Sequence, residues 1–197
     1  MMARSKTMDR VRSGVRERVF VVFGLVATFW IVWAIDHFAF DGGLRRYGIL
    51  PREKIGLRGI VFAPFLHGDL WHLISNTVPF AILGLLVAMR DAGEFVAVTA
   101  IVSLVSGLGT WVLGNPGTVH IGASGLVFGY FGFLVARGLF DRSLFSFLVA
   151  VAVGVLYGGM IWGLIPFRMQ PGISWEGHLC GAVGGVLSAW MFRRSAR

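Results

Sequence analysis

Charged residues are absent from five long stretches of the chain, at residues 19–35, 73–89, 95–136, 143–167 and 179–192. A helix needs about 20 mostly apolar residues to cross the hydrocarbon core of a bilayer. The longest stretch can cross twice, because the sequence GNPGT at 114–118 is a turn signal in its middle. The pattern therefore predicts six crossing helices, near residues 19–40, 73–89, 95–113, 122–137, 144–166 and 178–192.

The composition agrees with an all-α membrane protein that has no separate soluble domain. Of the 197 residues, 56% are hydrophobic, and the mean hydropathy is +0.75. These values exceed those of ordinary soluble domains. We expect a six-helix domain at residues 19–192, with basic tails at 1–18 and 193–197. The first apolar stretch is followed by bulky residues rather than a small-residue cleavage site, so we expect it to be retained.

The net charge of +8 is distributed unevenly across the predicted membrane. With six crossings, both tails and two short loops share one side, which holds twelve of the 18 Lys and Arg residues. The positive-inside rule then predicts that both termini are cytoplasmic. A soluble basic face that could bind nucleic acid is missing, so anionic lipid headgroups are the expected partners of the tails.

The unusual polar residues of the apolar stretches fall at one depth. Helices two, four and six all begin at the outer face, and they begin with His72 and Asn76, with Ser124 and with His178. A polar side chain in a crossing helix is costly and usually faces the protein interior or a water-filled cavity. The pattern therefore predicts that these four side chains converge beneath the outer surface.

Small residues follow the polar ones on helices four and six. Stripes of such residues let two membrane helices approach closely, and most such stripes serve packing alone. Here they adjoin Ser124 and His178, so they also predict that these two side chains come within reach of each other. The stripes consist of Gly125, Gly129 and Gly132 on helix four, and of Gly181 and Gly185 on helix six.

These residue types suit acyl transfer. A serine hydroxyl becomes nucleophilic when a neighbouring base removes its proton, and His178 is the candidate base for Ser124. The free N–H groups at the start of helix four, with His72 and Asn76, can stabilise an oxyanion. Glu176 is expected to be a solvated loop residue, so the pattern describes a dyad rather than a triad.

A metal site is the weaker interpretation of the histidines. His67, His72 and His178 could meet, but no thiolate or acidic ligand joins them, and the helical HExxH spacing is absent. We therefore expect no metal and no cofactor. The single cysteine, Cys180, excludes an internal disulfide.

Three motifs resemble those of rhomboid intramembrane serine proteases of the bacterial six-helix type. They are HGDLWHLISN at 67–76, GASG at 122–125 and HLCGAVGG at 178–185, and the resemblance covers roughly residues 55–192. It implies that Ser124 is the nucleophile, that His178 is the base, and that His72, Asn76 and the Ser124 N–H form the oxyanion hole. The residues with a structural role near the site would be His67, Gly122, Gly125, Phe128, Gly181 and Gly185.

For two of these residues, His67 and Phe128, a more definite structural role can be stated. The resemblance implies that His67 braces the first loop. Phe128 stands where the family often has tyrosine, and it can stack on His178 but cannot donate a hydrogen bond. The orientation of His178 would then rest on packing alone.

The resemblance also implies the substrate class, namely single-pass membrane proteins cut in or near their transmembrane helix. Helix five, with Tyr157, Gly158 and Gly159, and the loop at 166–177 could form a mobile gate and cap. The expected location is the bacterial cytoplasmic membrane.

Two other classes of function are compatible with parts of the pattern. A non-catalytic rhomboid-like binder or adaptor of membrane proteins is expected to lose the serine or the base, and both are present here. A small transporter would place polar groups at several depths, whereas this chain clusters them on one side.

Overall fold

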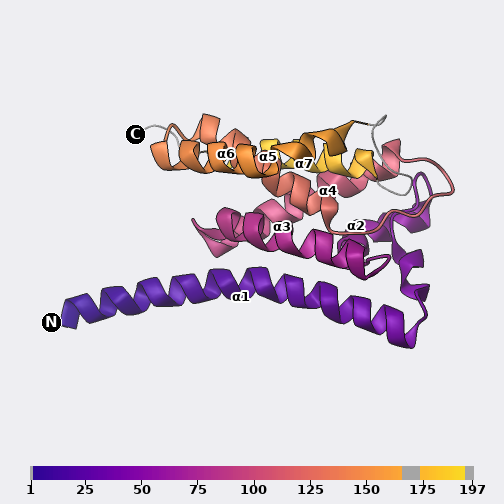
Figure 1. Ribbon diagram of the computed structural model, residues 1–197, viewed down its shortest axis with the longest axis horizontal. Helices are drawn as coiled ribbons and strands as arrows, with labels where there is room; N and C mark the ends of the chain where they lie inside the picture. The colour runs from indigo at the N-terminus through magenta and orange to yellow at the C-terminus, as the bar shows by residue number, and fades with distance from the viewer. Residues whose placement is uncertain (1, 166–173, 194–197) are drawn as a thin grey trace.

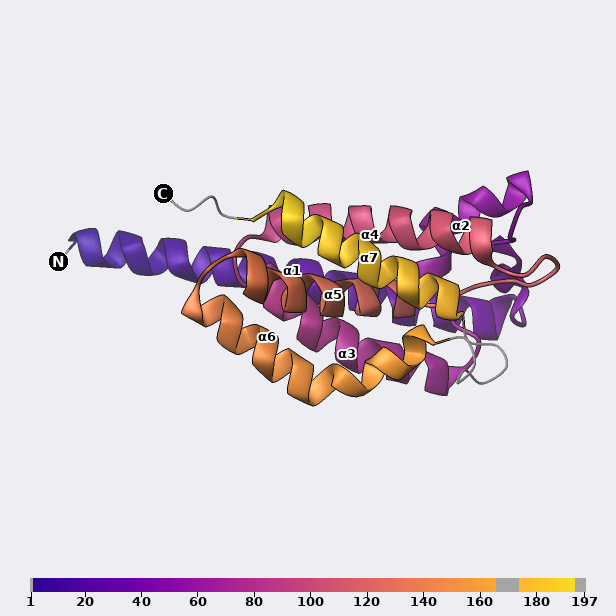
Figure 2. The same cartoon turned by 90° about the horizontal axis from the view of Figure 1, so that it is seen from above.

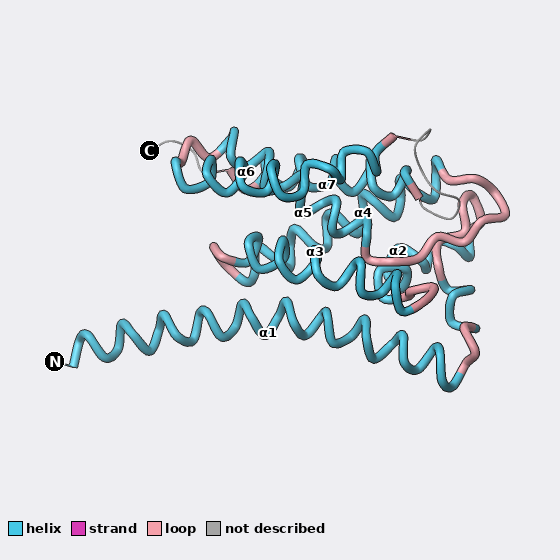
Figure 3. Tube along the Cα trace, in the orientation of Figure 1, coloured by secondary structure: helices cyan, strands magenta, loops and turns pink. Residues whose placement is uncertain are grey.

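The computed structural model describes residues 2–165 and 174–193, with side chains from residue 14 onward, and this part of the chain is helical without strands (Figures 1 and 3). The fold class is therefore all-α, as the sequence predicts. The elements are α1 (Met2–Ala39), η1 (Gly43–Tyr47), η2 (Lys54–Arg58), α2 (Gly59–Phe62), η3 (Ala63–Phe65), α3 (Leu70–Ala88), α4 (Ala92–Leu113), α5 (Ser124–Phe140), α6 (Leu144–Tyr157), η4 (Gly158–Leu164) and α7 (Trp175–Met191).

Six long helices coincide with the six predicted crossings. Four helical segments are long and apolar enough to span a membrane, namely Gly14–Ala39, Leu70–Ala88, Ala92–Leu113 and Leu144–Leu164. The other two, α5 and α7, have 17 residues each. Most boundaries agree with the prediction to within three residues, but α1 already begins at Met2 and the fifth crossing changes from α-helix to 3-10 helix after Tyr157.

Helix α5 is the centre of the bundle (Figure 2). It packs on α3, α4, α6 and α7, and eleven of its 17 residues are buried. Its closest neighbour is α7, where glycines face backbone directly. A methyl group at Gly181 would overlap the Gly125 carbonyl, and one at Gly185 would overlap the Gly129 carbonyl. The stripes of small residues thus bring the two backbones together, as expected for membrane helices.

Helix α6 lies at the edge of the bundle (Figure 2). Val153 is its one buried residue, and its large apolar side chains are mostly exposed. It packs mainly on α5, where a methyl group at Gly138 would overlap the Cβ of Ala150. This helix therefore has the fewest buried residues among the six long helices.

The segment between α1 and α3 folds into short helices that the apolar pattern does not predict. Its backbone pairs with the loop before α5 through an isolated bridge between Ile49 and His120. Gly59 packs against the backbone of Gly48 and Ile49 so closely that a methyl group there would overlap it. Arg58 stacks on Tyr47, at 4.4 Å from the ring centroid. These contacts anchor the first loop beside the start of α5.

A charged cluster lies where α5 and α7 end, at the end of the bundle nearer to the two chain termini in Figure 1. Arg137 at the end of α5 contacts Glu94 at 2.9 Å and Asp141 at 2.8 Å. Arg90 contacts Glu94 at 3.4 Å and donates to the Phe192 carbonyl at 3.1 Å. This end carries the arginines that the sequence assigns to the cytoplasmic side.

Candidate active site

Ser124 and His178 meet at the opposite end of the bundle. Ser124 is the first residue of α5, and His178 lies in the first turn of α7. The distance from the serine Oγ to the histidine Nε2 is 2.9 Å, although 54 residues separate them in the chain. The histidine is 6% exposed, whereas the serine is half-buried and borders open space. This distance lies within the range in which a proton can be transferred.

Two groups orient the His178 ring. Phe128, one turn after the serine on α5, stacks on the ring with centroids 4.0 Å apart and planes 9° from parallel. The Nδ1 atom lies 3.0 Å from the carbonyl oxygen of Gly163 in η4. A carbonyl can only accept, so Nδ1 carries the proton and Nε2 is left to accept from the Ser124 hydroxyl. The expectation that packing alone orients this ring is therefore wrong.

His72 presents a ring donor to the same site. The Gly68 N–H donates to the His72 Nδ1 at 3.3 Å, so in the neutral ring the proton resides on Nε2. Nε2 lies against Gly122, where a Cβ would stand only 2.5 Å from it. Gly122 also has a φ of 111°, a conformation that side chains rarely adopt. Glycine at 122 thus leaves the space into which His72 points.

The Asn76 side chain lies one turn further along α3. It is 4% exposed, and its Nδ2 donates to the His72 carbonyl at 2.9 Å. An amide nitrogen has two hydrogens, so one donor remains for the site. The N–H groups of Ser124 and Gly125 belong to the first turn of α5, where a helix provides no acceptor for them. Donors from two helices therefore converge near the serine.

Two further contacts position α7 and were not predicted. The Ser106 hydroxyl of α4 donates to the Gly177 carbonyl at 2.8 Å. A methyl group on Gly125 would overlap this Ser106 hydroxyl. Glu176 is 4% exposed and accepts from Ser174 at 3.1 Å. The prediction that Glu176 is a solvated loop residue is therefore wrong. The residue belongs to the first turn of α7, where a negative charge is favourable.

His67 lies beneath the first loop, beside His72. It is 1% exposed, and its ring packs against Phe29 at 5.6 Å and His72 at 5.2 Å between centroids. Burial lowers the pKa of His67 to about 3, helped by the neighbouring His72. It is therefore neutral at physiological pH and joins the aromatic packing under the site. Its role as a brace for this loop stays a prediction.

A small cavity adjoins Ser124 on the side of α4. Its volume is about 40 Å³, which is sufficient for water. Its polar lining consists of Ser103, Ser106, Thr110, His120, Ser124 and Ser174. The site thus contains a hydroxyl, an oriented imidazole, several free donors and a space that suits water.

The chain matches the family model described as Rhomboid domain over residues 56–195. This chain belongs to the rhomboid family. An uncharacterized relative in Mycobacterium tuberculosis is 41% identical over 182 residues, which cover 89% of this chain and 75% of that protein. An uncharacterized relative in Mycobacterium leprae is 42% identical over 182 residues, which cover 89% of this chain and 72% of that protein. A Bacillus subtilis protein named "Putative rhomboid protease YdcA" is 30% identical over 132 residues, covering 64% of this chain and 62% of that protein. An integral membrane location follows from this rhomboid membership and from the apolar helices.

Proposed function

We propose that this rhomboid protein is an intramembrane serine endopeptidase that uses Ser124 and His178 as a dyad. The observation that supports it best is the 2.9 Å contact between the two side chains, with the second ring nitrogen already occupied by Gly163. This tautomer leaves a basic nitrogen facing the hydroxyl, which is what general-base activation of a serine requires.

The proposed reaction has two stages. The Ser124 Oγ attacks the substrate carbonyl while its proton passes to the His178 Nε2. The resulting oxyanion accepts hydrogen bonds from the Ser124 N–H, the His72 Nε2–H and the Asn76 amide. As the intermediate collapses, His178 gives its proton to the leaving amine, and an acyl-enzyme remains. Water then attacks the ester, with the histidine as base, and releases the carboxylate product.

The proposed substrates are single-pass membrane proteins, cut in or near their transmembrane helix. A peptide bond must be extended to reach both the hydroxyl and the oxyanion donors, so the substrate helix has to unwind near its outer end. Helix α6 is a candidate gate because it has one buried residue. The proposed cap at 166–177 lies mostly outside the described residues, which resume at residue 174.

The proposed orientation places both termini in the cytoplasm of a bacterium and the site near the outer face. Support comes from the arginines at the end of the bundle where α1 begins, and from the site at the other end (Figure 1). No metal or cofactor has a part in the proposed reaction.

The test uses the purified protein in liposomes with a fluorescent single-pass substrate. We expect Ser124→Ala and His178→Ala each to abolish cleavage, and we expect a fluorophosphonate to label the wild type but not Ser124→Ala. Ser188→Ala is the matched control, because this buried α7 hydroxyl donates to the Gly184 carbonyl within its own helix. Cleavage that survives both dyad changes, or binding of the substrate without any cleavage by the wild type, would refute the proposal.

A further inference from the structure

The acceptor of the His178 Nδ1 proton belongs to a part of the bundle with few buried residues, one in α6 and none in η4. Gly163 lies in η4, which directly continues α6. The carbonyl thus occupies the place beside a catalytic histidine that a carboxylate holds in a triad. Because the group is a backbone atom, it cannot be positioned independently of the helix that carries it.

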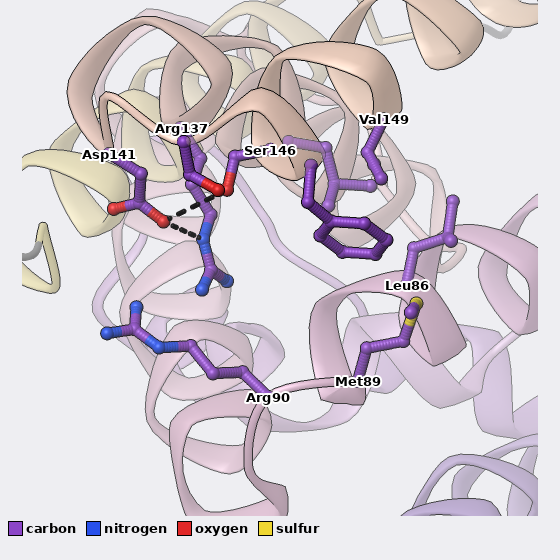
Figure 4. Close-up of a pocket in the computed structure, with 10 residues that line it drawn as sticks. Leu86, Met89, Arg90, Arg137, Asp141, Ser146 and Val149 are labelled. Atoms are coloured by element: carbon purple, nitrogen blue, oxygen red, sulfur yellow. Dashed lines mark hydrogen bonds and ion pairs between the residues drawn. The ribbon is translucent and has the colours of Figure 1, made fainter.

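The start of α6, at the end of the helix away from His178, is fixed to the end of α5. Asp141 accepts from Arg137 at 2.8 Å and from Ser146 of α6 at 3.3 Å, and Figure 4 shows these contacts at the wall of a pocket. This pocket, about 220 Å³, separates the start of α6 from the end of α3. Leu86 of α3 and Met89, which follows this helix, line the side that faces α6 (Figure 4). Helix α6 is therefore held at its base by α5 and is open toward α3.

The near end of the same unit lies against the active site. A methyl group added to Gly163 would stand 2.6 Å from the Cζ of Phe128 and 3.4 Å from the His178 Nδ1. Glycines at 154, 158 and 159 have no atom within 4 Å of such a group. Among these four glycines, close contact thus occurs only where η4 lies on the histidine and its stacking partner.

We propose that the Gly163 carbonyl is a positioning group for His178, and that the base is aligned only while α6 and η4 are packed against α5 and α7. The inference rests on the proposed protease function. If α6 moves outward to admit a substrate helix, Nδ1 loses its acceptor and the ring can turn away from Ser124. Catalysis then requires η4 to return, so that cleavage follows closure of the gate.

The chemical reason is the charge that forms during the reaction. When Nε2 takes the serine proton, the buried ring becomes an imidazolium and both nitrogens become donors. The Gly163 carbonyl satisfies the Nδ1 proton, and without it a charged donor is left unpaired in a desolvated site. The groups around the ring from the other helices are Ser124, Phe128 and His72.

The test compares Gly163→Ala with Gly24→Ala, which adds the same methyl group to α1, where it meets no atom within 4 Å. We expect Gly163→Ala to lower kcat roughly 10- to 150-fold, the range for loss of a hydrogen bond to a charged group, with KM within about twofold. Gly24→Ala should keep the wild-type kcat. Equal kcat values for the two variants, while the wild type cleaves its substrate, would overturn the inference and leave the protease proposal intact.

A spectroscopic measurement covers the case in which Gly163→Ala fails to fold. In wild-type protein with 15N-labelled histidine, assigned by comparison with His178→Ala, we expect the resting His178 to be the Nδ1–H tautomer with a hydrogen-bonded proton. A resting ring protonated at Nε2 would overturn the inference. Where Gly163→Ala does fold, loss of this Nδ1–H signal in it, but not in Gly24→Ala, is the expected result.

Discussion

The packing of α5 on α7 allows a quantitative prediction at Gly185. In Gly185→Ala, the new methyl group would overlap the Gly129 carbonyl and stand 2.7 Å from the Phe133 nitrogen, whereas ordinary contact begins at 3.4 Å. Both neighbours are backbone atoms of the central helix, so no side chain can rotate to make room. The helices must therefore separate by at least about 0.7 Å, the difference between these two distances.

Such a separation affects stability and activity together. Overpacking of this kind costs about 1–3 kcal/mol, and in a chain of this size each kcal/mol lowers Tm by roughly 2–4 °C. The same shift, carried to the site, lengthens the 2.9 Å contact between Ser124 and His178 to about 3.6 Å, beyond a useful hydrogen bond. We therefore expect Gly185→Ala to unfold several degrees earlier in detergent and to lose most of its cleavage activity.

Gly154→Ala is the control for this experiment. A methyl group there meets no atom within 4 Å, on a helix that faces lipid. Replacing a helical glycine by alanine then gains up to about 1 kcal/mol, so we expect an equal or higher Tm. The reasoning about backbone contact is refuted if thermal unfolding, followed by circular dichroism, gives Gly185→Ala the same Tm as Gly154→Ala.

Three further changes test individual groups of the site. Phe128→Leu removes the stacking on His178, and we expect kcat to fall about 10-fold, as measured against Phe128→Tyr, which keeps the ring. Gly122→Ala forces a side chain into a positive φ and against the His72 ring, so we expect kcat to fall on the order of 10²–10³-fold, as for loss of an oxyanion donor. His67, with a pKa lowered to about 3, binds its proton less readily when folded than when unfolded, so stability should fall as the pH drops from about 6.5 toward 3. His67→Phe should flatten that part of the pH–Tm curve.

Each of these expectations has a clear contrary outcome. An unchanged kcat in Phe128→Leu would mean that the hydrogen bond to Gly163 orients the base by itself. Wild-type kcat in Gly122→Ala would remove His72 from the oxyanion hole. A pH–Tm curve of His67→Phe that parallels the wild type would show that acid destabilises the protein elsewhere.

The helices and the approach of Ser124 to His178 could be predicted from the sequence, because both leave a pattern of apolar or small residues along the chain. Apolar stretches mark crossings, and glycines at helical spacing mark faces that can approach closely. The first loop could not be predicted in the same way. Its short helices depend on contacts such as that of Gly59 with the backbone of Gly48, which no periodic pattern records.

The environment of His178 was mispredicted for a related reason. A carboxylate can be recognised in the sequence as a partner for a histidine ring, and Glu176 was expected to be a solvated loop residue. The actual partner is a main-chain carbonyl, and every residue has one, so only the path of the chain after Tyr157 can reveal it. A carboxylate on a rigid helix would hold the base aligned at all times. A carbonyl on η4 holds it only in one arrangement of α6, so the choice of acceptor ties the chemistry to the position of the helix.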